Sequence, residues 1–109
     1  MFRVAKNKAE KELEEFDLVF SALAHEARRR VLVVLMGRHG QMTAGDIVER
    51  FDCSWPTMTR HLQILEEAGL IRVEKSGRER HYILNSQKLH QVLGGWLSWF
   101  EKNETEKKL

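Results

Sequence analysis

The sequence has a single cysteine, a single proline and no long apolar run. The lone cysteine excludes an internal disulfide, and the short apolar runs exclude a membrane-spanning helix. Cys53 has no partner for an internal disulfide, which fits a reducing compartment. The longest apolar run, VLVVLM at residues 31–36, is far shorter than the roughly 20 residues that span a bilayer. The first residues also lack the charged-then-apolar order of a signal peptide. We therefore expect a cytoplasmic protein without a membrane segment.

Excess charge and catalytic motifs are scarce as well. The chain has 18 basic and 16 acidic residues, so its net charge of +2 would not by itself draw it to nucleic acid. We find no glycine-rich phosphate loop, no Ser/His/Asp order, no paired carboxylates and no metal triad, so we expect no enzyme. The 109 residues, 42% of them apolar, suit one domain spanning 1–109 with one core.

Apolar residues recur at helical spacing in several segments. Such a pattern predicts one helix from about residue 8 to 24, and HEARRRVLVVLMGRHG predicts a second that ends at Gly37 or Gly40. MTAGDIVERF predicts a short third helix, capped by Thr43 with Asp46 three residues later. SQKLHQVLGGWLSWFEK predicts a last helix that continues through two glycines.

The segment SWPTMTRHLQILEEAGL, residues 54–70, predicts a helix with two different faces. Ser54 can cap it, and Pro56 is tolerated in a first turn. Met58, Leu62 and Leu65 repeat at helical spacing and should be buried. Thr57, Thr59, Arg60 and Gln63 then lie off the buried stripe, and Gly69 ends the helix.

After Gly69 the apolar period shortens to two, in LIRVEK and RERHYIL. This pattern predicts a β-hairpin that turns at Ser76-Gly77. Helix, short turn, helix and hairpin is the order of a winged helix-turn-helix. We therefore predict a mainly α protein with a small β-hairpin wing and about five helices.

In that fold the first residues of the second helix meet base edges in the major groove. Arg60 suits a guanine edge or a phosphate, Gln63 an adenine edge, and the two threonines a phosphate or a thymine methyl. Trp55 either packs against the duplex or covers the core, and the sequence leaves both open. The predicted DNA-binding residues are Ser54, Trp55, Pro56, Thr57, Thr59, Arg60 and Gln63 on the helix, with Lys75, Arg78 and Arg80 on the hairpin.

Other polar residues receive structural interpretations. The hairpin cluster also includes His81, but glutamates alternate with it, as in a merely solvated ribbon. His61 lies beside the predicted buried stripe, so we expect a partly buried structural histidine. In the ARRR run at 27–30 we expect at most one phosphate contact, and a surface ion pair between Arg30 and Glu26.

ALAHEARRRVLVVL, TRHLQILEEAGLI and GRERHYIL together resemble the ArsR/SmtB winged-helix repressors, over residues 22–85. The resemblance implies a homodimeric, DNA-binding repressor that reads a palindrome-like operator in double-stranded DNA. It also implies that the first and last helices form the dimer interface, and both have large apolar faces. The predicted interface residues are Leu13, Phe16, Phe20, Leu89, Val92, Leu93, Trp96, Leu97 and Phe100.

The sequence departs from the metal-sensing members of that family. The family's Cys-x-Cys pair falls on Thr43 and Gly45, which cannot be thiolate ligands, and His90 stands alone on the last helix. We therefore expect no metal and no cofactor, and a place in the metal-independent, autorepressor-like branch. The alternatives are a metal- or thiol-responsive repressor of this fold, with Cys53 as the thiol, and a winged-helix protein-interaction module that does not bind DNA.

Overall fold

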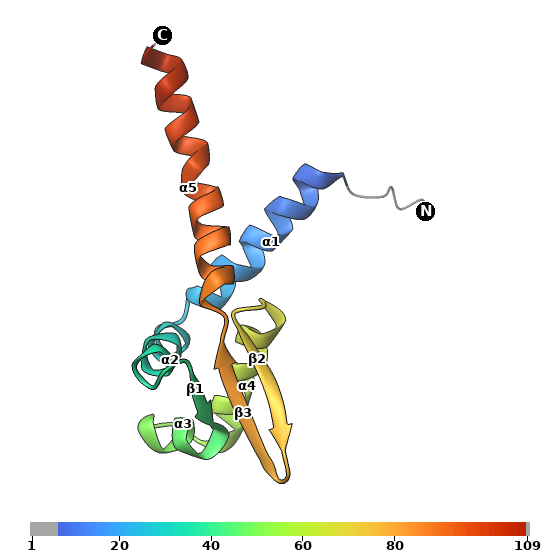
Figure 1. Ribbon diagram of the computed structural model, residues 1–109, viewed down its shortest axis with the longest axis vertical. Helices are drawn as coiled ribbons and strands as arrows, with labels where there is room; N and C mark the ends of the chain where they lie inside the picture. Colours follow the sequence, from blue (N-terminus) through green and yellow to red (C-terminus); the bar gives the residue numbers. More distant parts are fainter. Residues whose placement is uncertain (1–6, 109) are drawn as a thin grey trace.

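The computed structural model describes residues 7–108, with side chains as far as residue 101, and shows five helices and a three-stranded sheet there (Figure 1). In chain order the elements are α1 (Lys8–Leu23), α2 (Glu26–Gly37), β1 (Gln41–Thr43), α3 (Ala44–Arg50), α4 (Trp55–Glu67), β2 (Ile71–Ser76), β3 (Glu79–Leu84) and α5 (Ser86–Lys108). This order confirms the predicted winged helix-turn-helix.

The helices begin at polar caps. The Thr43 hydroxyl accepts a hydrogen bond from the Asp46 amide at 3.2 Å, and the Ser54 hydroxyl accepts one from the Thr57 amide at 3.3 Å. Both caps confirm the predicted starts of α3 and α4. The cap of α2 was not predicted, because it is a histidine: Nδ1 of His25 accepts from the Ala27 amide at 3.1 Å.

The hairpin turn corrects the prediction by one residue. Ser76 pairs with Glu79 in the β2–β3 register, so the loop consists of Gly77 and Arg78, not Ser76-Gly77. The reason is conformational, because Gly77 has a φ of +63°. A type II′ hairpin turn needs a positive φ at its first central residue, where glycine carries no steric cost.

The sheet contains a strand that sequence patterning missed. β1 pairs antiparallel with β3, Gln41 opposite Ile83 and Thr43 opposite His81, which gives the order β1-β3-β2. Three residues are too few to show an alternating pattern. Met42 is nevertheless buried in the core, and its strand joins the wing to the start of α3.

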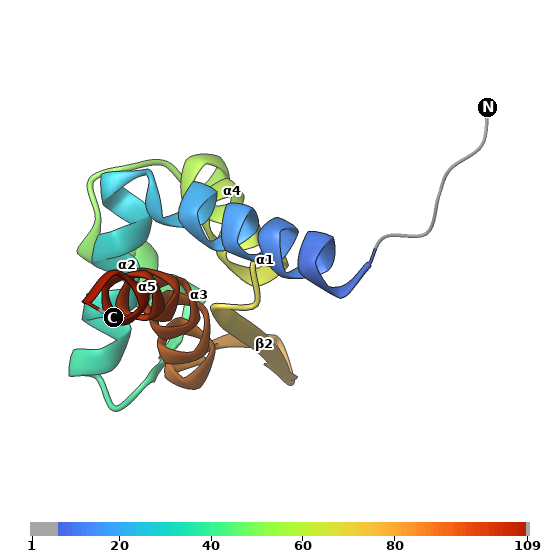
Figure 2. The ribbon, with the colours of Figure 1, turned by 90° about the horizontal axis from the view of Figure 1, so that it is seen from above.

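The core lies where α2, α3 and α4 meet the sheet and α1 packs on α2 and α4, while α1 and α5 extend away from it and diverge (Figures 1 and 2). α5 continues unbroken through Gly94 and Gly95. The buried apolar residues are Phe16, Val19, Ala22, Val31, Leu32, Leu35, Met42, Ile47, Met58, Leu62, Leu65, Ala68, Leu70, Ile71, Tyr82 and Val92.

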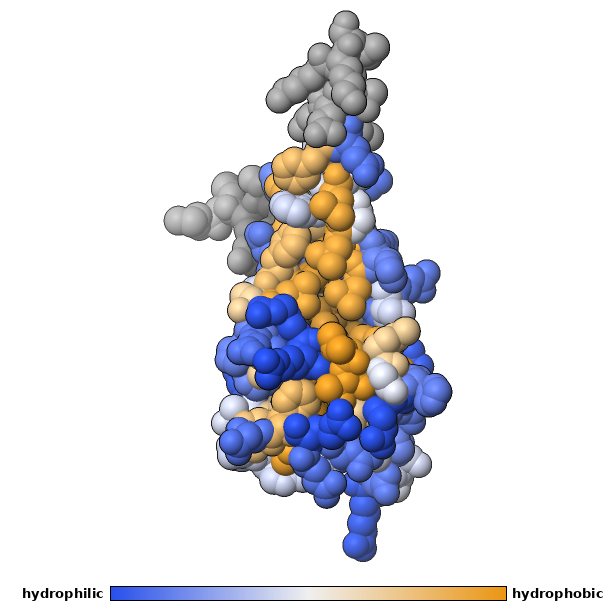
Figure 3. Space-filling view, turned by 90° about the vertical axis from the view of Figure 1, so that its left-hand side faces the viewer, coloured by the Kyte–Doolittle hydropathy of each residue, from blue (hydrophilic) through white to orange (hydrophobic). Residues whose placement is uncertain are grey.

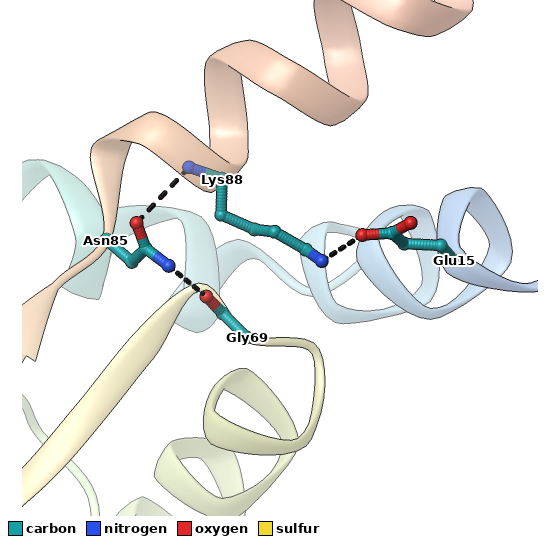
Figure 4. A network of polar contacts seen from close by, with 4 residues as sticks. All are labelled: Glu15, Gly69, Asn85 and Lys88. Carbon is teal, nitrogen blue, oxygen red and sulfur yellow. Dashed lines mark hydrogen bonds and ion pairs between the residues drawn. The ribbon is translucent and has the colours of Figure 1, made fainter. Parts of the chain in front are cut away.

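A polar network joins the end of α4 to the start of α5 and to α1 (Figure 4). The Asn85 side chain donates to the Gly69 carbonyl at 3.0 Å and accepts from the Lys88 amide at 3.3 Å. The Lys88 ammonium in turn pairs with Glu15 of α1. Asn85 therefore caps α5 and fixes it to Gly69, just after the end of α4.

Replacing Gly69 with alanine should destabilise the protein by about 1–2 kcal/mol, the usual cost of a left-handed backbone for a residue with a Cβ. Gly69 has a φ of +77°, whereas the added Cβ itself meets only ordinary contacts with Lys88. Chemical denaturation measures the free energy of unfolding. Gly37→Ala is the control, since its Cβ would face open space at the end of α2. Equal effects of the two changes would contradict the role of backbone conformation.

Candidate nucleic-acid interface

The two faces of α4 differ as predicted. Met58, Leu62 and Leu65 are buried against the rest of the subunit, and the helix contacts α1, α2 and β2. Arg60 and Gln63 are exposed on the other side of the helix. Thr57 is exposed too, and Thr59 is half-buried. The subunit thus leaves these polar side chains accessible from outside.

The first turn of α4 is exposed as a whole. Ser54 and Pro56 are both exposed, and the Ser54 hydroxyl donates to the Thr57 hydroxyl at 3.0 Å. Trp55 is 55% exposed and lies outside the hydrophobic core, so the structure does not support its role as a core cover. Its indole instead lines a groove of about 410 Å³ between the start of α3 and the wing.

The wing turns basic side chains toward α4. Lys75 stands opposite Arg80 in the strand register, on the same face as the pair Val73 and Tyr82. These residues form one wall of a groove of about 330 Å³ whose other wall is α4; the lining residues are Thr59, Gln63, Glu66, Val73, Lys75, Arg80 and Tyr82. Arg78 and Arg80 also line the groove beside Trp55. The structure therefore brings Trp55, Thr59 and Gln63 of α4 together with Lys75, Arg78 and Arg80 of the wing. The other predicted helix residues are Ser54, Pro56, Thr57 and Arg60, which are exposed but line neither groove.

The opposite face of the wing holds side chains that pair among themselves. His81 follows Arg80 along β3, so its side chain points away from α4. The structure therefore separates His81 from the basic hairpin cluster to which the sequence analysis assigned it. Its ring lies 3.3 Å from the Glu79 carboxylate and 3.1 Å from the Gln41 amide nitrogen. Arg72 is likewise on this face, 3.4 Å from Glu74.

The arginines of the ARRR run are engaged within the subunit. Arg30 pairs with Glu26 at 2.5 Å, which confirms the predicted surface ion pair. Arg29 donates to the Leu23 carbonyl at 2.8 Å, and Arg28 binds the same end of α1. Helix periodicity could not reveal this role, because the carbonyls that they bind belong to the preceding helix. Cationic side chains at a helix C-terminus are favoured by the dipole and satisfy its free carbonyls.

A second surface, which we call the apolar face, follows α1 and α5. An orange band runs along α5 to the body of the molecule (Figure 3). The Trp96 ring makes edge contacts with Phe20, at a centroid distance of 5.0 Å, and with Phe100, at 4.9 Å. Its exposed residues on α5 are Trp96, Leu97, Trp99 and Phe100, and Leu13 is exposed on α1. Leu18 is also exposed, on another side of α1 beside Glu14, Asp17 and Ser21.

Two residues predicted for the dimer interface are instead core residues of the single chain. Phe16 and Val92 are buried between α1 and α5, because each points to the inner side of its helix. Phe20, Leu89 and Leu93 are half-buried. Leu18 and Trp99, which the periodicity assigned to no face, are more than half exposed.

Two observations concern the predictions about metals and Cys53. Among the residues described, no three His, Cys, Asp or Glu side chains gather as metal ligands would. Cys53 is half-buried and packs against the core in the turn before α4. None of the helices in the described part of the chain is long and apolar enough to cross a membrane.

The fold and this surface define a winged helix-turn-helix protein, and known proteins identify its family. Residues 23–74 match a helix-turn-helix domain model. The transcriptional repressor SdpR of Bacillus subtilis (strain 168) is 36% identical over 88 residues, which are 81% of this chain and 96% of that protein. The arsenical resistance operon repressor of the same organism is 31% identical over 81 residues, 74% of this chain and 76% of the relative.

A solved structure shows the same relationship. The ArsR-like transcriptional regulator from Rhodococcus sp. RHA1 superimposes with a TM-score of 0.72 at 27% identity, covering 88% of this chain and 92% of that one. The chain belongs to the ArsR family of winged helix-turn-helix transcriptional regulators. The proteins that it resembles are regulators of transcription, not enzymes.

Proposed function

We propose that this protein is a homodimeric transcriptional repressor that binds a palindrome-like operator in double-stranded DNA through α4 and the β2–β3 wing. One observation carries the proposal: Arg60 and Gln63 face outward from α4, and the wing places Lys75 and Arg80 beside Gln63. Amide and guanidinium groups read base edges, and the basic side chains of the wing neutralise phosphates. A protein-binding surface would instead expose several large apolar residues there, whereas Trp55 is the only one exposed on α4 and the wing.

The apolar face supplies the dimer contact in this proposal. Exposed Trp96, Leu97 and Phe100 form a continuous apolar surface on α5, and Leu13 is exposed on α1. Large exposed apolar patches mark association surfaces. A two-fold dimer would present two copies of α4 about 34 Å apart, one turn of the duplex. Cytoplasmic location and independence of metal stay predictions.

Selection of bound duplexes from a random DNA pool tests the proposal as a whole. We expect enrichment of sites with two inverted half-sites whose centres are about one helical turn apart. The selection is repeated with added zinc and with a chelator, so that any metal requirement is visible. Failure to enrich any sequence under all three conditions would contradict operator binding.

Arg60→Ala should weaken binding to the selected operator by about 1–3 kcal/mol, because the side chain is exposed on the outer face of α4. Arg60→Lys separates two roles in the same titration. Lysine keeps the charge for a phosphate but lacks the planar fork that binds guanine bidentately. A base contact predicts that lysine also fails, and unchanged affinity of the alanine variant would remove Arg60 from the interface.

The double variant Arg78→Ala, Arg80→Ala should flatten the salt dependence of binding. Each lost phosphate contact lowers the slope of log affinity against log salt by about one. Fluorescence anisotropy over a salt series measures this slope. Arg72→Ala is the matched control, since Arg72 lies on the opposite face of the wing beside Glu74. A slope that both variants leave unaltered would exclude phosphate contacts by the wing.

Trp96→Ala should weaken dimerisation, because buried tryptophans dominate association energies, with losses of about 2 kcal/mol or more. Trp96 also contacts Phe20 within the subunit, so a second variant is needed. Leu97→Glu places a charge where the side chain is 54% exposed in the single chain. Sedimentation velocity at decreasing concentration measures both. If both variants stay dimeric down to the same concentration as the wild type, the apolar face is excluded as the interface.

A further inference from the structure

Arg28 connects three helices through one guanidinium. From α2, its Nε donates to the Ala22 carbonyl at 2.7 Å, and its Nη2 donates to the Ser21 carbonyl at 3.4 Å, both at the end of α1. Its Nη1 lies 3.0 Å from Nδ1 of His61, in the middle of α4. The side chain therefore ties the helix that carries the proposed DNA contacts to the α1–α2 corner.

This contact requires a neutral histidine. A guanidinium has only donors, so Nδ1 of His61 must be the acceptor, and the ring proton must sit on Nε2. His25 has the same constraint, because its Nδ1 accepts from the Ala27 amide. The two imidazole rings lie 4.4 Å apart between centroids, and His61 is 8% exposed. Two neutral imidazoles and one permanent cation thus meet at this corner, where His61 is buried, Arg28 is half-buried and His25 is exposed.

We propose that the contact between Arg28 and neutral His61 holds α4 in its DNA-binding position, and that protonation of His61 breaks the contact and weakens operator binding in acid. The proposal rests on the proposed function and adds a regulatory property to it. Arg28 and His61 are positioning residues here: both are turned into the subunit, and neither belongs to the exposed face of α4.

The charges around His61 support this direction. Arg28 from α2 and His25 from the turn before α2 face the ring, while α1 contributes the carbonyls of Ser21 and Ala22 to the guanidinium. A proton on Nδ1 would remove the acceptor and place a second positive charge 3.0 Å from the first. Burial lowers the pKa of His61 below 6.5, and His25 and Arg28 lower it further.

The sign of the pH effect on stability follows from this lowered pKa. The unfolded chain takes up a proton on His61 near pH 6.5, whereas the folded protein resists it. The folded state then binds fewer protons, so this contribution to stability is fully present above pH 6.5 and decreases as the pH falls toward the lower, folded pKa. Operator binding should decrease at lower pH, as the pH falls through the pKa of His61 in the folded protein without DNA, because only there does the folded protein take up this proton.

The test compares operator affinities at pH 7.5 and pH 5.5 for the full chain and two variants. His61→Asn places an amide oxygen near the position of Nδ1, so it keeps an acceptor for Arg28 but does not titrate. His81→Asn is the matched control, because Nδ1 of His81 also lies near a side-chain nitrogen, that of Gln41, on the far face of the wing. Each protein is normalised to its own affinity at pH 7.5, and the duplex is the site selected at pH 7.5.

We expect the wild type and His81→Asn to lose about five- to tenfold more affinity in acid than His61→Asn, since one unit of pKa difference between two states corresponds to tenfold. Parallel pH profiles of the wild type and His61→Asn would overturn the proposal. If no duplex is enriched at pH 7.5, the proposed operator binding is contradicted. The contact between Arg28 and His61 is then tested by a measurement that needs no DNA.

Nitrogen-15 spectra of the wild-type histidine and arginine side chains give that second readout and need no variant. At pH 7.5 they should show His61 protonated on Nε2 with Nδ1 as an acceptor. On acidification, the signals of His61 and of Nε of Arg28 should change together. Titration of His61 with no change at Arg28, or a proton on Nδ1 at pH 7.5, would refute the proposed contact.

Discussion

The burial of one stripe of α4 is the constraint on which the rest of the molecule depends. Met58, Leu62 and Leu65 are removed from water against α1, α2 and β2, and burial of each such side chain is worth about 1.5–3 kcal/mol. A helix so anchored cannot rotate about its axis without exposing that stripe. Arg60 and Gln63 are thereby held outward, although they themselves make little contact with the subunit.

Polar contacts fix what the apolar stripe leaves free, namely the position of α4 along its own axis and its angle to the neighbouring helices. Asn85 binds the carbonyl that follows α4 and caps α5, and Lys88 extends this connection to α1 (Figure 4). Arg28 binds α4 near its middle and α1 at its end. The helices α1 and α5 are therefore connected to α4 at two separate points.

Sequence patterns predicted what depends on local chemistry or on periodicity. The caps at Thr43 and Ser54 and the two faces of α4 follow from a few neighbouring residues. Contacts between distant segments were beyond such reasoning. β1 is defined by its partner β3 and not by its own three residues, and Phe16 and Val92 are buried because α1 and α5 pack on each other. The roles of Arg28 and Asn85 depend in the same way on residues far along the chain, so only the structure shows them.

The outward face of α4 has a consequence for how such a protein can change. Arg60 and Gln63 make no contribution to the core, so replacing them would change the proposed contacts with DNA at little cost in folding free energy. The stripe behind them has the opposite character, since any change there disturbs close packing. If α4 reads DNA as proposed, specificity and stability are encoded at neighbouring positions of one helix, and a lineage could acquire new binding sites in its genome while its architecture is retained.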